Sequence, residues 1–314
     1  MMAIPHSPGS PWPLRSLLFI PAHRIDWVRK VAASHTDAVI LDLEDSVPTG
    51  QKSQARALIA EEIALLRMNG IVPFVRINGI GHGCETDLAS SVVPGLAGVM
   101  LPKTDSPLDI QTLDQLLFAA EASAKMEAGT VGIIPLPETA KGMWLAYEIA
   151  AASKRVSGLI TAVSGPVSGD VSRAFGFEPS EEGSEQLFLQ SRIILASRAA
   201  GANYPIGTLM GTGLGDLAGV ERLASRARRL GFSGAVLIHP SHVAIANRVF
   251  RPSEEEVGYS RGLIDAISAG EANGAGAVSY RGMMVDAAMV PTAISVLEAD
   301  ARYRARDVQF AGER

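Results

Sequence analysis

The feature that most constrains this chain is a regular alternation of short apolar runs with longer amphipathic segments. Apolar runs with few charges are typical of parallel strands that are buried on both faces. Eight such runs occur, at residues 16–20, 38–43, 73–77, 98–101, 132–136, 159–163, 204–207 and 235–238. Helical spacing is found between them, for example at 53–68, 184–201 and 216–230, where Asp216 is a predicted N-cap and Gly231 a predicted stop.

Eight strand–helix pairs predict an α/β fold with a closed (β/α)₈ (TIM) barrel. The alternation alone leaves an open, doubly wound sheet as the alternative. The 314 residues suit one barrel with an appendage. We expect an N-terminal arm at 1–14, a barrel catalytic domain at 15–252 and a C-terminal helical lid or oligomerisation segment at 253–314. Within the last segment, the stretch GEANGAGAVSYRG predicts a flexible connection before a final helix at 290–304.

Charge and cysteine content exclude several classes of protein. The formal net charge is -5 and Lys and Arg form no long run, so neither nucleic acid nor an anionic membrane is expected as a partner. No apolar run approaches the roughly 18 residues of a membrane span. The single cysteine, Cys84, rules out an internal disulfide framework. A cytoplasmic protein that acts on a small molecule is therefore expected.

Polar residues gather where the predicted strands end, which is where the active sites of barrel enzymes lie. They are Asp42, Glu44 and Asp45 after the second run, Arg76 after the third, Lys103 after the fourth, Glu138 after the fifth and Asp170 after the sixth.

Glu138 and Asp170 are the candidate metal ligands. Two carboxylates that face one cavity repel each other unless a cation lies between them. Oxygen ligands suit Mg²⁺, with Mn²⁺ as the alternative ion, and the sequence offers no His/Cys cluster for zinc. Each carboxylate has an alternative role at a helix N-terminus: Glu138 as a cap after Pro137, and Asp170 as an N-cap.

Arg76 provides a planar cationic fork for a substrate carboxylate. Together with Mg²⁺ it would hold an α-keto or α-hydroxy acid and stabilise an enolate that forms when a carbon–carbon bond breaks. Asp42, Glu44 and Asp45 are interpreted as an ion-pair network that supports Arg76 rather than as catalysts. Lys103 is either part of this support or a Schiff-base lysine, which would require a lowered pKa.

Seven motifs give the chain a resemblance to a known family. They occur in order from Arg15 to about Pro252: RSLLFIPAHR, AVILDLEDSV, VRIN, VMLPK, PLPETAKG, SGPVSGDVSRAFG and GFSGAVLIHPSHV. The chain resembles the citrate lyase beta-subunit-like group of the HpcH/HpaI aldolase superfamily, which includes malyl-CoA lyases. The resemblance implies a (β/α)₈ barrel, Mg²⁺, and cleavage or formation of a bond beside a carboxylate, often in a coenzyme A thioester of a 3-hydroxy acid.

The resemblance also implies roles for individual residues. Glu138 and Asp170 match the metal ligands, with Glu138 also expected at the substrate, and Arg76 matches a substrate-binding arginine. The positions that contact coenzyme A in malyl-CoA lyase relatives correspond here to Phe19, Arg24 and Lys30.

The segment YRGMMVDAAMVPTAISVLEAD is similar to the lid of malyl-CoA lyases, in which an Asp from a neighbouring subunit reaches the active site. That position is Asp286 here, and the resemblance implies that it is a catalytic acid–base. The alternative is that Asp286 caps a short turn. A homo-oligomer is expected, as a trimer or hexamer. Because the beta subunit of three-component citrate lyase tends to lack this lid, we expect a stand-alone enzyme.

Two departures from the family pattern leave the substrate open. The loop SGPVSGD, which ends at Asp170, is two residues longer than the usual G-x-E-D and lacks its Glu. In the lid, Ala287 stands where Pro usually follows the Asp.

The sequence therefore predicts a Mg²⁺-dependent carbon–carbon lyase. Its substrate would be a 3-hydroxyacyl-CoA such as malyl-CoA or citryl-CoA, which yields acetyl-CoA and a 2-oxo acid. The alternatives are a coenzyme A-independent aldolase of the pyruvate or oxaloacetate type, an acyl-CoA thioester hydrolase, and a non-catalytic binding protein that keeps the metal site.

Overall fold

Seven of the eight apolar runs form strands of one parallel sheet within the compact unit Leu14–Phe250. The computed structural model describes residues 10–163, 165–167 and 169–312. The strands are β1 (Ser16–Pro21), β2 (Ala38–Asp42), β3 (Val72–Arg76), β4 (Gly98–Leu101), β5 (Gly132–Pro135), β6 (Ile206–Leu209) and β7 (Gly234–Leu237). Every residue of β2, β4, β6 and β7 is buried, as the lack of charges predicts.

The strand order is β5-β4-β3-β2-β1-β7-β6, and all neighbours are parallel. Strands that follow each other in the chain are therefore neighbours, and the last strand of the unit pairs with the first. A doubly wound sheet instead reverses direction at a switch point near its middle. The observed order excludes that alternative and leaves β5 and β6 as the two edges of the regular sheet.

The prediction of a strand at 159–163 is wrong, because this segment forms only single bridges. Ile160 N–H donates to the Pro135 carbonyl of β5 at 3.1 Å, and Thr161 N–H donates to Ile206 of β6 at 3.2 Å. On the β5 side the ladder stops because Pro135 has no N–H to donate. On the β6 side the N–H of Leu159 donates to the Ser197 hydroxyl instead of a strand carbonyl, at 3.2 Å.

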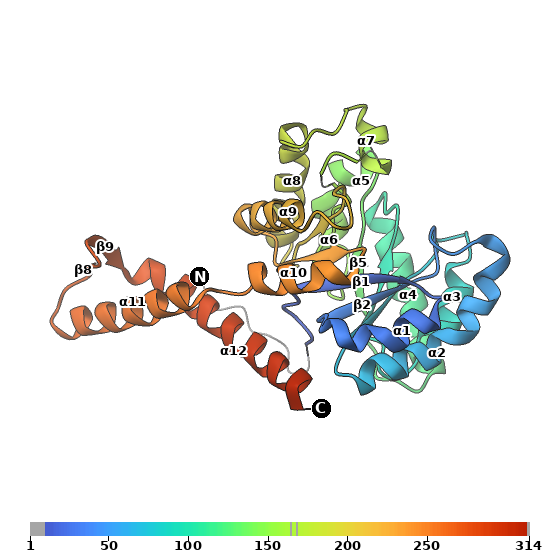
Figure 1. The fold of residues 1–314 in the computed structure, drawn as a ribbon, viewed down its shortest axis with the longest axis horizontal. Helices are drawn as coiled ribbons and strands as arrows, with labels where there is room; N and C mark the ends of the chain where they lie inside the picture. Colours follow the sequence, from blue (N-terminus) through green and yellow to red (C-terminus); the bar gives the residue numbers. More distant parts are fainter. Residues whose placement is uncertain (1–9, 164, 168, 313–314) are drawn as a thin grey trace. The chain divides into compact units, whose positions relative to one another are not determined.

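Helices lie around the outside of this curved sheet (Figure 1). They are α1 (Ile25–Val31), α2 (Lys52–Met68), α3 (Cys84–Ser91), α4 (Pro107–Ser123), α5 (Ala140–Trp144), α6 (Ala146–Ala151), α7 (Asp170–Phe175), α8 (Leu187–Ala199), α9 (Leu217–Leu230) and α10 (Val243–Phe250). The predicted boundaries of α9 are confirmed: the Asp216 side chain accepts from Gly219 N–H at 2.9 Å, and Gly231 ends the helix at φ 112°. Each strand thus delivers its carboxyl end to the same edge of the sheet.

Of the described residues, 10–13 and 251–312 belong to the second compact unit. It contains α11 (Glu254–Ala272), β8 (Ala277–Tyr280), β9 (Met283–Asp286), a 3₁₀ turn at Ala287–Met289 and α12 (Val290–Gly312). Its small core is built from Leu263, Ile267, Val285 and Ala293. Residues 1–9 of the expected N-terminal arm lie outside the described residues. The expected domain boundaries after residues 14 and 252 stay a prediction.

The flexible connection predicted from the glycine-rich stretch is wrong in part. Residues 277–280 form β8, which pairs with β9 as an antiparallel hairpin. The turn between the strands is Arg281-Gly282, with φ 48° and φ 80°. Two positive φ values in a two-residue loop match the twist of a hairpin. Glycine adopts a positive φ without steric cost, so Gly282 at the second position favours this turn and the hairpin.

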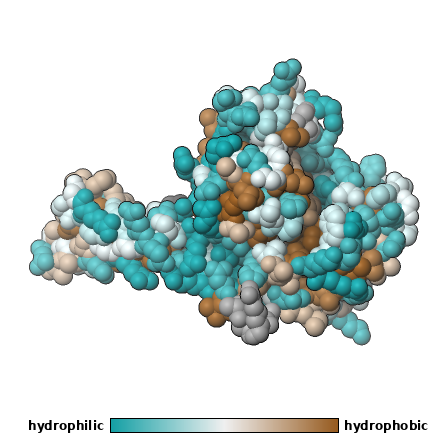
Figure 2. Space-filling view, viewed as in Figure 1, coloured by the Kyte–Doolittle hydropathy of each residue, from teal (hydrophilic) through white to brown (hydrophobic). Residues whose placement is uncertain are grey.

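Hydropathy differs between the visible surfaces of the two units. Hydrophobic residues gather over the middle of Leu14–Phe250, whereas the visible surface of Arg251–Arg314 is mainly hydrophilic (Figure 2). No helix in the described part of the chain is both long enough and apolar enough to cross a membrane.

Glu62 on α2 is fully buried, and both carboxylate oxygens are unpartnered among the described residues. Burial, with a contribution from the neighbouring Glu61, raises the pKa of Glu62 to about 8. Because this pKa is raised from 4.5 in the folded state, the contribution of Glu62 to stability is fully present below about pH 4.5 and falls, by about 1 kcal/mol per pH unit, as the pH rises to about 8. We predict that Glu62→Gln removes most of this slope, as measured by urea denaturation at a series of pH values.

The matched control is Glu61→Gln, which removes an exposed carboxylate one residue away that pairs with Arg29. It should keep most of the slope. An unchanged pH slope in Glu62→Gln would show that the buried carboxyl is not responsible for it.

Candidate active site

The centre of the site is a buried ion pair at the carboxyl ends of β2 and β3. Asp42 and Arg76 are register partners in the two strands. Arg76 Nε donates to Asp42 Oδ1 at 2.7 Å, and Nη2 donates to Oδ2 at 2.6 Å. Asp42 also accepts from the backbone N–H groups of Glu44 and Ser46, at 2.9 and 3.1 Å. Burial alone would raise the pKa of Asp42, but the Arg76 guanidinium lowers it, so the carboxylate stays charged.

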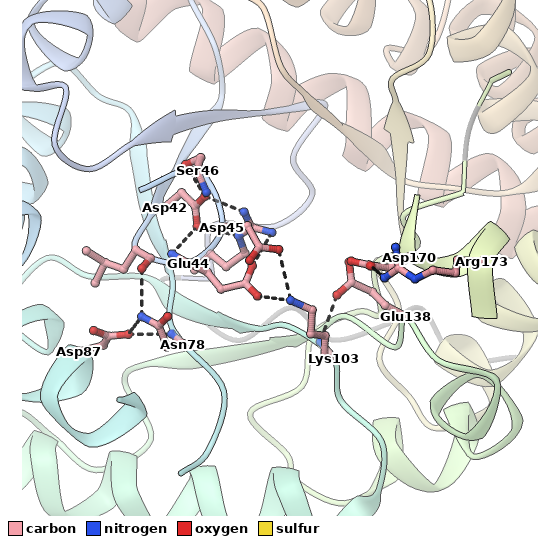
Figure 3. Close-up of polar contacts among 12 residues, drawn as sticks. Asp42, Glu44, Asp45, Ser46, Asn78, Asp87, Lys103, Glu138, Asp170 and Arg173 are labelled. Atoms are coloured by element: carbon pink, nitrogen blue, oxygen red, sulfur yellow. Dashed lines mark hydrogen bonds and ion pairs between the residues drawn. The ribbon is translucent and has the colours of Figure 1, made fainter. Parts of the chain in front are cut away.

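Glu44 connects this pair to Lys103. Its Oε2 lies 3.0 Å from Arg76 Nη1, and its Oε1 accepts from Lys103 Nζ at 2.6 Å (Figure 3). Lys103 Nζ also donates to Asp45 Oδ2 at 3.2 Å. Burial alone would lower the pKa of the Lys103 ammonium, but Glu44 and Asp45 raise it above its ordinary value. A Schiff-base lysine needs the opposite shift, so the surroundings of Lys103 favour the supporting role over that alternative.

Lys103 also contacts Glu138 through its backbone. Its φ is 50°, in the left-handed region that residues other than glycine rarely adopt. In this conformation its N–H donates to Glu138 Oε2 at 3.2 Å while the ammonium reaches Glu44. One residue thereby links two carboxylates of the site, a backbone role that the sequence did not reveal.

Glu138 is 7% exposed and follows β5. The helix that follows is capped by Thr139, whose hydroxyl accepts from Gly142 N–H at 3.0 Å, so Glu138 is not the cap. Burial raises the pKa of Glu138 to about 7; Arg76 opposes the rise, and Asp170 and Glu44 add to it. A buried carboxyl whose charge is disfavoured by other carboxylates is suited to a cation.

Asp170 is the first residue of α7, and the N-cap position is Gly169, so the N-cap alternative is also wrong. Its carboxylate lies beside Glu138 (Figure 3), and its charge contributes to the raised pKa of that residue. The side chain is 31% exposed and pairs with Arg173. Of the longer loop before Asp170, positions 164 and 168 lie outside the described residues.

Among residues 10–163, 165–167 and 169–312, no group of three or more His, Cys, Asp or Glu side chains is arranged to hold a metal ion. Glu138 and Asp170 could supply two oxygen ligands. Mg²⁺ is commonly held by one or two carboxylates, with water and substrate oxygens in its other positions. The residues present fit that ion.

A cavity of about 300 Å³ opens at this end of the sheet. Its polar lining residues include Asp42, Ser46, Arg76 and Glu138. Its apolar lining residues include Phe19, Trp27, Leu136, Ile160, Met210 and Ile238. Apart from Phe19, these apolar residues were not among the predicted site residues, although Leu136 directly follows β5, at the carboxyl end where the polar residues gather.

The predicted coenzyme A residues lie on β1 and around α1. The ring of Phe19 is under the Arg76 guanidinium, 4.9 Å from ring centroid to Cζ. Arg24 donates to both carboxylate oxygens of Asp26 at 3.0 Å and lies 4.1 Å above the Trp27 ring. Lys30 is exposed on α1. Their contact with coenzyme A stays a prediction.

Asp286 belongs to the Arg251–Arg314 unit, at the end of β9. It is the N-cap of the turn Ala287–Met289, and its Oδ1 accepts from Ala288 N–H at 3.0 Å. The turn-capping role is therefore present in the chain. The acid–base role of Asp286 stays a prediction.

Comparison with known proteins decides the family. The model of the HpcH/HpaI aldolase/citrate lyase family matches residues 15–240. The chain belongs to this family. It is 32% identical over 292 residues to a citrate lyase subunit beta-like protein of Deinococcus radiodurans, covering 92% of this chain and 98% of that protein. It is 33% identical over 297 residues to an L-malyl-CoA/beta-methylmalyl-CoA lyase of Cereibacter sphaeroides, covering 90% and 92%.

A solved structure has the same fold over most of the chain. It is the protein CitE from Mycobacterium tuberculosis in complex with magnesium, acetoacetate and coenzyme A. The TM-score is 0.67 at 29% sequence identity, and the alignment covers 91% of this chain and 97% of that one. The region that matches the family therefore includes the strand ends at which the candidate site lies.

The Asp42–Arg76 pair gives a prediction about stability. Asp42→Asn leaves a buried guanidinium, 15% exposed, without its bidentate partner. Breaking such a pair on one side is expected to cost about 3 kcal/mol in the free energy of unfolding, as measured by chemical denaturation. The control is Asp26→Asn, which removes the partner of the more exposed Arg24 and should leave stability unchanged within error. Equal losses in both variants would contradict the prediction.

Proposed function

We propose that this protein is a Mg²⁺-dependent carbon–carbon lyase. It cleaves or forms the bond between the acyl α-carbon and the hydroxyl-bearing carbon of a 3-hydroxyacyl-CoA such as malyl-CoA or citryl-CoA, with acetyl-CoA and a 2-oxo acid as the other side of the reaction. The observation that carries the proposal is the buried Arg76 guanidinium beside Glu138, a carboxyl whose pKa is raised to about 7. The relatives named above support the substrate class, because their names include malyl-CoA, magnesium and coenzyme A.

Arg76 is arranged to bind a carboxylate. Its hydrogen bonds to Asp42 use the Nε hydrogen and one hydrogen on Nη2, and Glu44 Oε2 lies 3.0 Å from Nη1 as an ion-pair partner. A guanidinium carries two hydrogens on each Nη, so at least one N–H on each remains for a ligand. Two donors on one planar group match the two oxygens of a 2-oxo or 2-hydroxy carboxylate. Asp42 and Glu44 hold the plane of the guanidinium, so it is ordered before the substrate arrives.

Glu138 and Asp170 would hold Mg²⁺, which when bound supplies a Lewis acid for the oxygen that becomes the 2-oxo group. The Lys103 N–H fixes the orientation of Glu138. In the cleavage direction a general base takes the hydroxyl proton, the hydroxyl oxygen forms the new C=O bond, and the electron pair of the broken bond moves to the acyl α-carbon. That carbon then takes up a proton and becomes the methyl group of acetyl-CoA. We assign this proton to Asp286 of a neighbouring subunit.

Two features of the fold belong to the same proposal. The sheet would close as a (β/α)₈ barrel through residues 156–161, which hydrogen-bond to β5 and β6. Residues 253–314 would serve as the lid and as the contact between subunits of a homotrimer or hexamer. The N-cap bond of Asp286 to Ala288 uses one carboxylate oxygen and leaves the other available for proton transfer.

The direct test is a screen of acyl-CoA and 2-oxo acid pairs in the presence of Mg²⁺, with mass detection of products. Condensed 3-hydroxyacyl-CoA supports the proposal. Free coenzyme A without condensation would indicate a thioester hydrolase, and turnover of 2-oxo acids alone would indicate a coenzyme A-independent aldolase. Tight binding of Mg²⁺ and coenzyme A without any turnover would identify a binding protein.

The metal ligands give a second prediction. Glu138→Gln and Asp170→Asn each keep the size of the side chain but remove a negative charge from the cation site. Turnover should fall more than 100-fold, since even residues that only support metal ligands contribute about 10–100-fold. Circular dichroism should show an unchanged fold. The control is Glu178→Gln on the loop after α7, and retained activity in either ligand variant would count against the assignment.

A subunit-mixing experiment tests the lid. Asp286→Asn and Glu138→Gln are each expected to be inactive alone. If Asp286 acts in the site of a neighbour, mixed oligomers contain some sites with an intact Glu138 from one chain and an intact Asp286 from the other. We expect partial recovery of activity after co-refolding of the two variants. No recovery, despite mixed oligomers detected by native mass spectrometry, would show that Asp286 acts within its own subunit or not at all.

A further inference from the structure

Trp27 is a large aromatic residue at the site that the mechanism above does not use. It lies in the first turn of α1, directly after the carboxyl end of β1, and lines the same cavity as Arg76 and Glu138. Its side chain is 45% exposed, and Ile238, also in the lining, is 44% exposed. Deeper lining residues such as Leu136 and Ile160 are buried. Trp27 and Ile238 therefore form the rim of the cavity.

The volume of the cavity determines which part of a coenzyme A thioester fits inside it and which part must extend past the rim. About 300 Å³ is at the small end of the range for ligand cavities. It can enclose the acyl end of a coenzyme A thioester, next to Arg76, but not the coenzyme A portion, which is called the carrier below. The carrier has to leave through an opening and lie against the residues around it.

Charge selects the side on which the carrier leaves. A second cavity of about 520 Å³ is lined by the four carboxylates Glu44, Asp45, Asp105 and Asp109, while its lining ammonium, Lys103, is paired with Glu44 and Asp45. These would repel the phosphates of a coenzyme A thioester. On the Trp27 side, Arg24 and Lys30 are three positions before and three positions after the tryptophan, with Asp26 as the partner of Arg24, so cations outnumber carboxylates there.

The indole of Trp27 is held before any ligand arrives. The Arg24 guanidinium lies 4.1 Å from the ring, and Asp26 holds that guanidinium through two hydrogen bonds of 3.0 Å. A fixed indole offers a flat apolar surface with little loss of conformational entropy on binding. An uncharged, flexible chain such as the pantetheine arm can pack on such a surface, while a charged group would lose hydration there.

We infer that Trp27 is a substrate-positioning residue that packs against the pantetheine arm of the acyl thioester where the arm leaves the cavity. This inference rests on the proposed lyase function. Trp27 would act on the thioester and not on the 2-oxo acid, which binds deeper at Arg76. Its removal should therefore weaken the use of one substrate and leave the other unchanged.

The kinetic test is run in the condensation direction, with the acyl-CoA and 2-oxo acid pair that the wild type uses best. Trp27→Ala should raise the KM for acyl-CoA about tenfold, the size of effect expected for loss of a contact residue worth more than 1 kcal/mol. The KM for the 2-oxo acid and the kcat should stay close to the wild-type values. Trp27→Phe should recover part of the loss, because it keeps an aromatic surface.

Trp144→Ala is the matched control. Trp144 is also exposed, at 72%, and also lies under an arginine guanidinium, that of Arg192 at 5.3 Å, but it is on α5 and outside the lining of the site cavity. It should leave both KM values unchanged. If the wild type turns over acyl-CoA and Trp27→Ala behaves like Trp144→Ala, the inference is overturned and the proposed function stands. If the wild type turns over no acyl-CoA, both are overturned.

A fluorescence titration identifies which part of the thioester Trp27 contacts. The chain has three tryptophans, so Trp12→Phe/Trp144→Phe leaves Trp27 as the single emitter. Pantetheine and coenzyme A should both change its emission, whereas adenosine 3′,5′-bisphosphate should not. A response to the bisphosphate but not to pantetheine would overturn the inference, because it would place the nucleotide end of the carrier at the indole.

Discussion

The site depends on one buried cation. Arg76 ends β3 beside Asp42 at the end of β2, and the parallel register of the two strands makes these residues direct partners. A guanidinium cannot lose its proton in a protein interior, so its burial requires carboxylates in contact with it. Asp42 provides two bonds and Glu44 a third contact, and Glu44 in turn holds Lys103. Strand pairing thus determines where the cation lies, and the cation determines where the carboxylates around it must be.

The same network leaves the site with an excess of negative charge. Arg76 and Lys103 are balanced within the network by Asp42, Glu44 and Asp45. Glu138 is buried, and Asp170 and Glu44 add negative charge near it, so its pKa rises although Arg76 opposes the rise. A divalent cation between Glu138 and Asp170 would reverse this rise by favouring both ionised carboxylates. Asp170 thus contributes to the raised pKa and would share the cation with Glu138, while burial is the largest cause of the rise.

Much of this arrangement could be predicted from the sequence because it depends on periodicity. Apolar runs marked seven strands, and parallel strands bring their carboxyl ends to one edge, which was enough to group Arg76, Lys103 and Glu138. The exception at 159–163 could not be recognised from hydropathy. That segment is apolar like a strand, but its pairing is limited by Pro135 on one neighbour and by the Ser197 hydroxyl on the other side. Contacts between residues so far apart in sequence leave no local pattern. Trp27 was missed for a related reason: a single aromatic residue in a short helix has no spacing signal, and only the fold brings it to the rim.

Lys103 illustrates how local backbone conformation and electrostatics are combined at one position. A left-handed φ of 50° costs a residue with a Cβ about 1 kcal/mol or more, and glycine would avoid that cost. Glycine would keep the N–H that orients Glu138, but it would remove the ammonium that neutralises Glu44 and Asp45. Glu44, which also faces Arg76, and Asp45 would then lack their shared ammonium partner. The strained lysine is favoured over glycine because the site needs both the direction of its backbone and the charge of its side chain.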